Sequence, residues 1–191
     1  MKYFNVGYKS ANYYLIDAGP RCLAVDGGWP GTLNDYGRQL RPTGKRVQDI
    51  DYLMVTHFHP DHAGLIQELK TKGAKFLGFD IQIPFIAPME AMIERTMKYG
   101  RIQPEGNLVL SIRESRDFLA KLGLEGQVVH TPGHTDDSVS LLLDSGDAFI
   151  GDLQPESRIM ESDEKSLDSW ALLRRLGAKR VHPGHGPPFE L

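Results

Sequence analysis

Three histidines and an aspartate fall within six consecutive residues, in the stretch THFHPDHAG that begins at Thr56. Imidazole nitrogens and carboxylate oxygens are ligands that zinc and similar divalent ions take from proteins. In an extended segment, residues two apart point the same way, so His57 and His59 can bind one ion. The adjacent pair Asp61 and His62 can turn toward a neighbouring ion. The spacing therefore predicts metal binding and suggests two ions.

Six residues cannot complete two such sites, because a catalytic zinc ion takes about three protein ligands and keeps one position open. Later segments offer His134 in HTPGHTDDS, Asp152 at the end of FIGD, and His185 in HPGHGPP. Glycine and proline give the backbone tight turns beside both histidines. A carboxylate has two oxygens, so Asp152 can bridge two ions. The predicted ligands are His57, His59 and His134 for the first ion, Asp61, His62 and His185 for the second, and Asp152 between them.

Every predicted ligand lies just after a predicted strand or in the loop that follows it. Short apolar segments at 2–8, 11–17 and 21–28 have the alternation and turn residues of sequential antiparallel strands. Further strands are expected at 51–56, 74–79, 127–130, 138–144, 147–152 and 178–182. Helices are expected at 32–42, 63–73, 111–123 and 166–177, with a Met-rich helix framed by Pro84, Pro88 and Pro104. Strand ends gather at one edge of a sheet, so this plan would bring the ligands together.

Composition limits the other classes of function. A chain of 191 residues with near-average composition is expected to form one globular domain over residues 1–191. The formal net charge of -3, with acids and bases interspersed, gives no electrostatic footprint for nucleic acid or an anionic membrane. Cys22 has no partner for an internal disulfide. The N-terminus lacks a signal-peptide run and no stretch approaches the roughly 20 apolar residues that span a bilayer, so we expect a cytoplasmic protein.

The pattern His57-x-His59-x-Asp61-His62, followed by TPGHT, GD and PGHG, resembles the metallo-β-lactamase-fold hydrolase superfamily in order and in setting. The resemblance spans most of the chain, including LAVDGG, where Asp26 looks like the early structural aspartate of that superfamily. It implies an α/β fold of the αβ/βα sandwich type, with two mixed β-sheets flanked by helices and the metals at one edge. It also implies two metals in the grouping given above.

Within the superfamily, the pattern is nearest to glyoxalase-II-like thioesterases. The best-known β-lactamase subclass places a cysteine in the second metal set, whereas position 152 is aspartate here and the single cysteine lies far upstream. The chain ends six residues after His185, so we expect no C-terminal helical domain of the kind that helps glyoxalase II hold glutathione. The extra domains of RNA-processing and flavodiiron members are not expected either.

The leading expectation is a dinuclear hydrolase that acts on a small ester, thioester or lactone, with a hydroxide bridging the ions as nucleophile. Zinc is the expected metal, with iron or manganese as alternatives. Asp61 is expected to orient the nucleophile as well as to ligate. The partner is a small-molecule substrate, with no nucleic acid and no membrane, and the open site leaves room for a wall from a second copy in a homodimer.

Two other readings stay open. The first is a non-haem iron oxidoreductase resembling persulfide dioxygenases, which bind one iron through the equivalents of His57, His134 and Asp152. The ligand types suit iron as well as zinc. The second is a catalytically silent metal-binding module.

Other chemically capable residues have plainer interpretations. His130 and His182 are interpreted as packed or surface residues and stay outside the site. The Met-rich segment is interpreted as the buried face of an amphipathic helix, with a pocket wall as the alternative. No cluster for an anionic substrate group is evident, and four cations are candidates by charge alone: Arg95, Lys98, Arg101 and Arg158.

Overall fold

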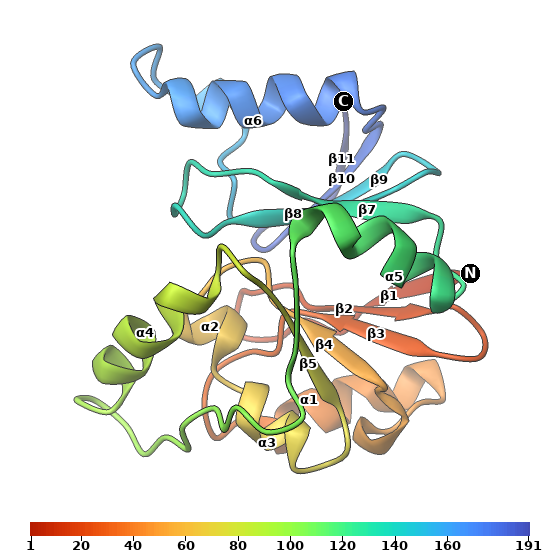
Figure 1. The fold of residues 1–191 in the computed structure, drawn as a ribbon, viewed down its shortest axis with the longest axis vertical. Coiled ribbons are helices and arrows are strands. Elements are labelled where there is room, and N and C mark those ends of the chain that lie inside the picture. Colours follow the sequence, from red (N-terminus) through yellow and green to blue (C-terminus); the bar gives the residue numbers. More distant parts are fainter.

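The computed structural model describes residues 1–191 as two β-sheets packed face to face, with helices on their outer faces (Figure 1). In the view of Figure 1 the first sheet lies below the second. In that view α1 (Leu33–Leu40) and α3 (Ile66–Lys70) lie below the first sheet, α2 (Pro60–Ala63) lies at its left end, and α6 (Glu164–Arg175) lies above the second sheet. The αβ/βα sandwich expected from the resemblance is confirmed.

The first sheet has six strands in sequence order: β1 (Lys2–Asn5), β2 (Tyr14–Asp17), β3 (Cys22–Val25), β4 (Tyr52–Met54), β5 (Lys75–Phe79) and β6 (Leu108–Leu110). The first three strands are antiparallel, as predicted, and β3 to β6 are parallel. Val25 at the end of β3 pairs with Met54 at the end of β4. Asp26 and Thr56 therefore leave the sheet at the same edge.

The second sheet has five strands in the order β11 (Phe189–Glu190), β10 (Arg180–Pro183), β9 (Asp147–Gly151), β8 (Val139–Leu143) and β7 (Gly126–His130). The pair of β9 and β10 is parallel, and the other pairs are antiparallel. Asp152 and Gly184 consequently leave neighbouring strands in the same direction. Helix α4 (Ile86–Ile93) projects at the left of Figure 1, and α5 (Ser115–Lys121) leads from the first sheet into the second.

Alternation along the central strands explains why both faces of the first sheet are buried. Cys22 and Ala24 pack toward helices α1 to α3, whereas Leu23 and Val25 pack toward the second sheet. Burial on both faces gives the nearly continuous apolar runs that parallel strands show. A third apolar cluster, centred on Trp170 of α6, covers the outer face of the second sheet. Both sheets are therefore anchored on two sides.

The observed elements differ from the sequence prediction in three places. The helix predicted at 63–73 begins earlier, at Pro60, and is divided into α2 and α3 around Gly64 and Leu65. Pro60 suits the first helical position because its missing N–H has no helical partner there. Strands β6 and β11 were not predicted, since each has only two or three residues. The helix predicted at 111–123 begins with a 3₁₀ turn, where Ser111 and Glu114 form a capping box, and continues as α5.

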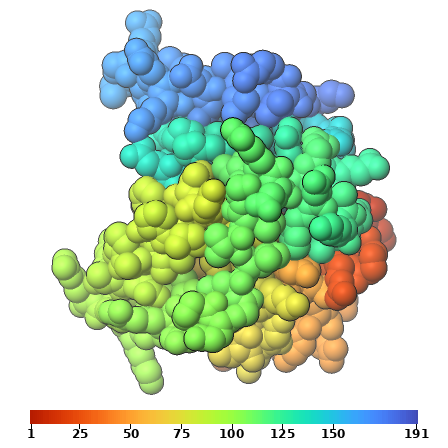
Figure 2. Space-filling view, viewed as in Figure 1, coloured from red at the N-terminus to blue at the C-terminus, as the bar shows by residue number.

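The space-filling view shows the C-terminal residues (blue) at the top of the molecule and the N-terminal residues (red) at the right of its lower half (Figure 2). Short 3₁₀ turns connect the main elements at Arg41–Thr43, Val47–Asp49, Ile83–Phe85, Ile112–Glu114 and Glu156–Arg158. None of the helices combines the length and the apolar character that a membrane crossing requires.

Candidate metal centre

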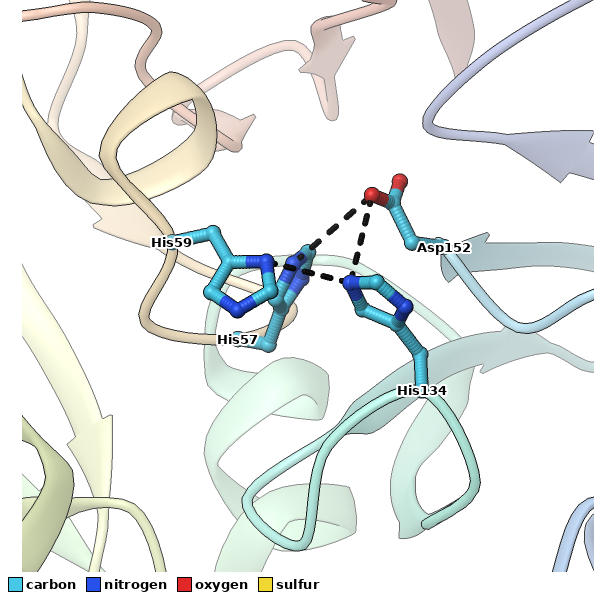
Figure 3. Close-up of side chains that lie close together, drawn as sticks. All are labelled: His57, His59, His134 and Asp152. Carbon is cyan, nitrogen blue, oxygen red and sulfur yellow. Dashed lines mark hydrogen bonds and ion pairs between the residues drawn. The ribbon is translucent and has the colours of Figure 1, made fainter.

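The seven residues predicted as ligands come from four segments at one edge of the sandwich and meet in two groups. Their ligand atoms lie within 4.8 Å of one another inside each group. The first group is His57, His59, His134 and Asp152, and the second is Asp61, His62 and His185. Figure 3 shows the first group, with four side chains from three segments converging on one point. The fold brings together the residues that the sequence suggested, with Asp152 in the first group.

Asp152 lies between the groups. One of its carboxylate oxygens is 3.6 Å from His134 Nε2 and 3.4 Å from His185 Nε2. Its other oxygen is 3.3 Å from His62 Nε2. The two oxygens therefore face residues of both groups, which is the position that a bridging carboxylate requires.

The donor atoms fit divalent ions. Nε2 of His57, Nε2 of His62 and Oδ1 of Asp152 are buried and have no hydrogen-bond partner. Buried polar atoms without partners are rare and costly in folded proteins. These three face the interior of one cluster whose other members are also metal-ligand types, so bound ions would satisfy all three. The residues present thus fit a site for two ions.

Asp26 fixes two segments of the first motif. Its carboxylate accepts hydrogen bonds from the backbone N–H of Thr56 at 2.7 Å and from Nδ1 of His62 at 2.9 Å. The Thr56 hydroxyl also donates to Asp26 and lies 3.1 Å from Nδ1 of His57. With both Nδ1 atoms engaged, each imidazole presents Nε2 to the cluster. Asp26, which the resemblance identified as a structural aspartate, thus supports the metal loop through these contacts.

The second sheet's last loop is held by residues near the N-terminus. Nδ1 of His185 donates to the Ser10 carbonyl at 2.7 Å, which leaves Nε2 facing Asp61 and Asp152. The amide of Asn12 donates to two carbonyls of the same loop, and the Tyr14 hydroxyl donates to the Pro183 carbonyl at 2.8 Å. These contacts join residues about 170 positions apart in the chain, so no local pattern in the sequence points to them.

Gln82 and Asp137 connect the loop of His57 and His59 to the loop that carries His134. Neither residue was predicted from the sequence. Asp137 accepts a hydrogen bond at 2.7 Å from the N–H of Phe58, which lies between the first two histidines. The Gln82 amide donates to the carbonyls of Val55, Thr56 and Asp137. Both side chains are buried. They tie the loop of His57 and His59 to the loop that carries the third histidine.

Burial and charge set the protonation of the cluster. Burial, with repulsion from the neighbouring histidines, holds the pKa of His57 well below its usual range, so its Nε2 is free to bind a cation. Burial opposes charging of His62 too, but the carboxylates of Asp26 and Asp152 outweigh it and raise the pKa of His62 to about 10. Burial opposes ionisation of Asp152, yet nearby histidines keep its pKa below the usual value. Ionised carboxylate is the form that binds metal.

The glycine of the last motif makes room for the cluster. A Cβ atom on Gly184 would lie 2.4 Å from Asp152 Oδ1 and 2.7 Å from His62 Cε1. Such distances are not tolerated, so only glycine lets the backbone of this loop approach the ligands. Gly151, with a φ of 57°, plays a similar part, because a Cβ there would meet the side chain of Thr56.

Both histidines that were left out of the site lie outside the cluster. His130 is exposed and donates to the Asp136 carbonyl. His182 is buried and donates to Asp147 at 2.9 Å. In the Met-rich segment, Met89 and Ile93 of α4 are buried in the core, as the amphipathic interpretation predicts, but Met92 is exposed, and Met97 is exposed and lies beyond the end of the helix. The interpretation therefore holds for only part of the segment.

Comparison with known proteins agrees with the fold and the motif. The family model of the metallo-beta-lactamase superfamily matches residues 6–185. A beta-lactamase-like protein 2 homolog of Drosophila melanogaster is 26% identical over 95% of this chain, and the chain spans 60% of that longer protein. The chain likewise spans 58% of the length of the corresponding Caenorhabditis elegans protein. A probable metallo-hydrolase of Methanocaldococcus jannaschii is also 26% identical, over 97% of this chain and 92% of its own length.

Two solved structures show the same fold. A metallo-beta-lactamase family protein of Thermus thermophilus superposes with a TM-score of 0.76 and 23% identity, over 98% of this chain and 74% of its own. A second protein, solved in a di-iron-bound form, has a TM-score of 0.74 and 21% identity, over 100% of this chain and 94% of its own. The chain belongs to the metallo-beta-lactamase superfamily of metal-dependent hydrolases, and its His/Asp cluster is the superfamily's type of metal site.

Proposed function

We propose that this protein binds two divalent metal ions and hydrolyses a small ester, thioester or lactone. The observation that carries the proposal is the assembly of two complete ligand groups around the shared carboxylate of Asp152. Zinc is the proposed metal, because three imidazoles with a carboxylate suit it, and iron is the first alternative. The di-iron form of one protein of the same fold supports that alternative.

The side chains of the two groups would have different roles in hydrolysis. When bound, two such ions supply a Lewis acid for the substrate oxygen and an acidified water at neutral pH. His57, His59 and His134 would hold one ion, Asp61, His62 and His185 the other, and Asp152 both. Asp61 Oδ2 lies 3.4 Å from His185 Nε2, at the side of the cluster where the second group meets Asp152. From there its carboxylate would accept a hydrogen bond from the attacking water and orient it toward the substrate carbonyl.

The presence of the second group favours a dinuclear hydrolase over a mononuclear iron dioxygenase. A single iron held by His57, His134 and Asp152 would leave Asp61, His62 and His185 without a function. Nε2 of His62 would also remain buried and unpartnered. A catalytically silent module would not require two complete groups of ligands.

Metal content tests the proposal before any substrate is known. Protein purified without chelator or added metal is analysed by inductively coupled plasma mass spectrometry, and we expect close to two ions per chain. His59→Ala should reduce the content, whereas His130→Ala, outside the cluster, should leave it unchanged. Thioesters, lactones, esters and phosphodiesters are then assayed with and without chelator. One iron per chain, together with oxygen consumption on glutathione persulfide, would replace the hydrolase with the dioxygenase.

A further inference from the structure

A pocket of about 690 Å³ opens directly beside the metal centre. Three residues of the centre, His134, Asp152 and His185, form part of its lining. From there it extends along the loop 153–158 to α6 and to the last residues of the chain. The volume lies in the range of pockets that hold small molecules. A substrate whose reacting bond lies at the centre would extend its remaining atoms into this space.

Most of the charges in the pocket wall neutralise one another. Arg174 of α6 is paired with Glu156 of the loop, and Glu190 is paired with Arg180 at 2.8 Å. Arg158 is different, because its guanidinium makes no hydrogen bond and no ion pair within the protein, and its side chain is exposed. It is thus the one cation of the wall that is free to bind a group from outside.

The sequence offered four cations as candidates for binding an anionic group, and the structure separates them. Arg95, Lys98 and Arg101 lie in the segment that follows α4, outside the pocket. Arg101 is further occupied by Glu94 at 2.7 Å. Arg158 alone among the four lines the pocket that contains the metal ligands.

The apolar residues of the pocket wall indicate what kind of group a bound anion would be attached to. Phe189 and Leu191 are partly exposed and contribute apolar surface to the wall, whereas Leu153 is buried beneath it. Such surface suits a short hydrocarbon segment, and a guanidinium suits a carboxylate or phosphate, which it binds through two parallel hydrogen bonds.

On this basis, and resting on the proposed hydrolase function, we propose that Arg158 forms an anion subsite. The substrate is an ester or thioester that carries a second, unreacting carboxylate or phosphate, separated from the reacting carbonyl by a short apolar segment. Arg158 determines specificity by binding this group and takes no part in bond cleavage.

Binding is tested with the unreactive anilide of glutaric acid, which keeps the free carboxylate, and with the matching terminal amide, which has no charge. Titration calorimetry on the metal-loaded protein should show that the charged anilide binds more tightly. Arg158→Ala should weaken its binding about fivefold, or ~1 kcal/mol, and should leave the neutral amide unchanged. Arg158→Lys should give an intermediate value. Arg95→Ala, an exposed cation outside the pocket, should change neither.

Turnover provides the second readout. The S-phenyl thioesters of glutaric acid and of its terminal amide are compared, and Arg158→Ala should raise KM for the charged thioester with little change in kcat. The thioester of 4-phosphonobutyric acid distinguishes a phosphate-sized group from a carboxylate. The subsite is wrong if Arg158→Ala affects charged and neutral probes equally, or if the carboxylate binds as well without the guanidinium.

The two proposals fail in different ways. If no thioester is hydrolysed but the anilide binds in a manner that depends on Arg158, the hydrolase function fails and the subsite stands. If both thioesters are hydrolysed without preference and the anilide shows no dependence on Arg158, the subsite fails and the hydrolase function stands.

Discussion

Asp26 Oδ2 lies 2.9 Å from Nδ1 of His62, and both groups are buried. Asp26 also has a φ of 66°, a left-handed conformation that costs about 1 kcal/mol or more in a residue other than glycine. The conformation turns the carboxylate toward Thr56 and His62 at the end of β3. The backbone therefore holds a strained residue at the point where it supports the metal centre.

Removing that support should weaken metal binding more than it weakens the fold. Outer hydrogen-bond partners of ligating histidines typically contribute about 10- to 100-fold in affinity, and we expect Asp26→Ala to lose that much. Competition with a chromophoric chelator measures the affinity, and thermal unfolding of the metal-free protein measures the fold. Asp26→Asn keeps a hydrogen-bond acceptor and should lie between. Unchanged affinity in a destabilised Asp26→Ala protein would show that the role is structural only.

Asp61→Asn separates orientation from ligation. The amide keeps one oxygen for the metal but has half the acceptors for the attacking water, so turnover should fall by about 100-fold while metal content falls by less than half. Rates on the best ester or thioester are compared with metal content on the same preparation. Equal losses of turnover and metal would remove the orienting role and leave Asp61 a ligand only.

The glycines of the last motif form a matched pair. Gly184→Ala would place a Cβ against Asp152 and His62, whereas Gly186 has open space around it and a φ of 84°. Gly184→Ala should lower metal content strongly, because the loop must withdraw from the ligands. Gly186→Ala should cost only about 1 kcal/mol of stability through backbone strain and should retain both ions. Metal analysis and denaturant unfolding of both variants test this. Full metal content in Gly184→Ala would contradict the packing argument.

Gln82 should act on the geometry of the first group of ligands. Gln82→Leu removes three hydrogen bonds to buried carbonyls and should destabilise the protein by about 1–3 kcal/mol. The visible spectrum of the cobalt-substituted protein should also change, because the loop of His57 and His59 is released. Gln103→Leu, at an exposed glutamine, is the control for both measurements. A destabilised variant with an unaltered spectrum would limit Gln82 to folding.

The pair of Asp147 and His182 predicts a pH dependence of stability outside the metal centre. Burial opposes ionisation of Asp147, but hydrogen bonds from His182, Ser145 and Tyr3 outweigh it and keep its pKa below the usual 3.8. The ionised form is therefore favoured by folding, and its contribution is present above about pH 4 and lost as the pH falls through the lowered pKa. Asp147→Asn should reduce the free energy of unfolding by about 1–2 kcal/mol at pH 7. The difference should shrink below pH 4.

Urea unfolding of the chelator-treated proteins between pH 3 and pH 8 measures that difference. Asp117→Asn, at an exposed carboxylate, should follow the wild type across the range. A gap between Asp147→Asn and wild type that stayed constant down to pH 3 would contradict the assignment.

The sequence predicted which residues the fold brings together at the candidate centre, because metal chemistry demands particular residue types. The side chains of His57 to His62 are close together in the chain, and the turns around His134 and His185 carry glycine and proline for geometric reasons. The central strands were predictable from continuous apolar runs, since both their faces are buried. The residues that hold the ligand loops in place through hydrogen bonds were not predictable. Gln82 and Asp137 have ordinary residue types, and their roles arise only when separate loops meet.

Short edge strands and the start of one helix were less predictable than the central strands. Strands β6 and β11 are short edge strands, and tertiary contacts rather than local alternation define them. The helix after the first motif was misplaced because Pro60 initiates it. Arg158 was one of four equal candidates until the fold placed it in a pocket wall.

Each group of ligands takes members from both sheets: His57 and His59 face His134 and Asp152, and Asp61 with His62 faces His185. A bound ion would thus act as a cross-link between two layers that otherwise meet mainly through apolar side chains. Because such an ion binds the folded state alone, its chemical potential would become a term in the stability of the sandwich. A shortage of metal would then lower the stability of the fold as well as abolish activity. Resistance to heat or proteolysis would therefore report on metal supply.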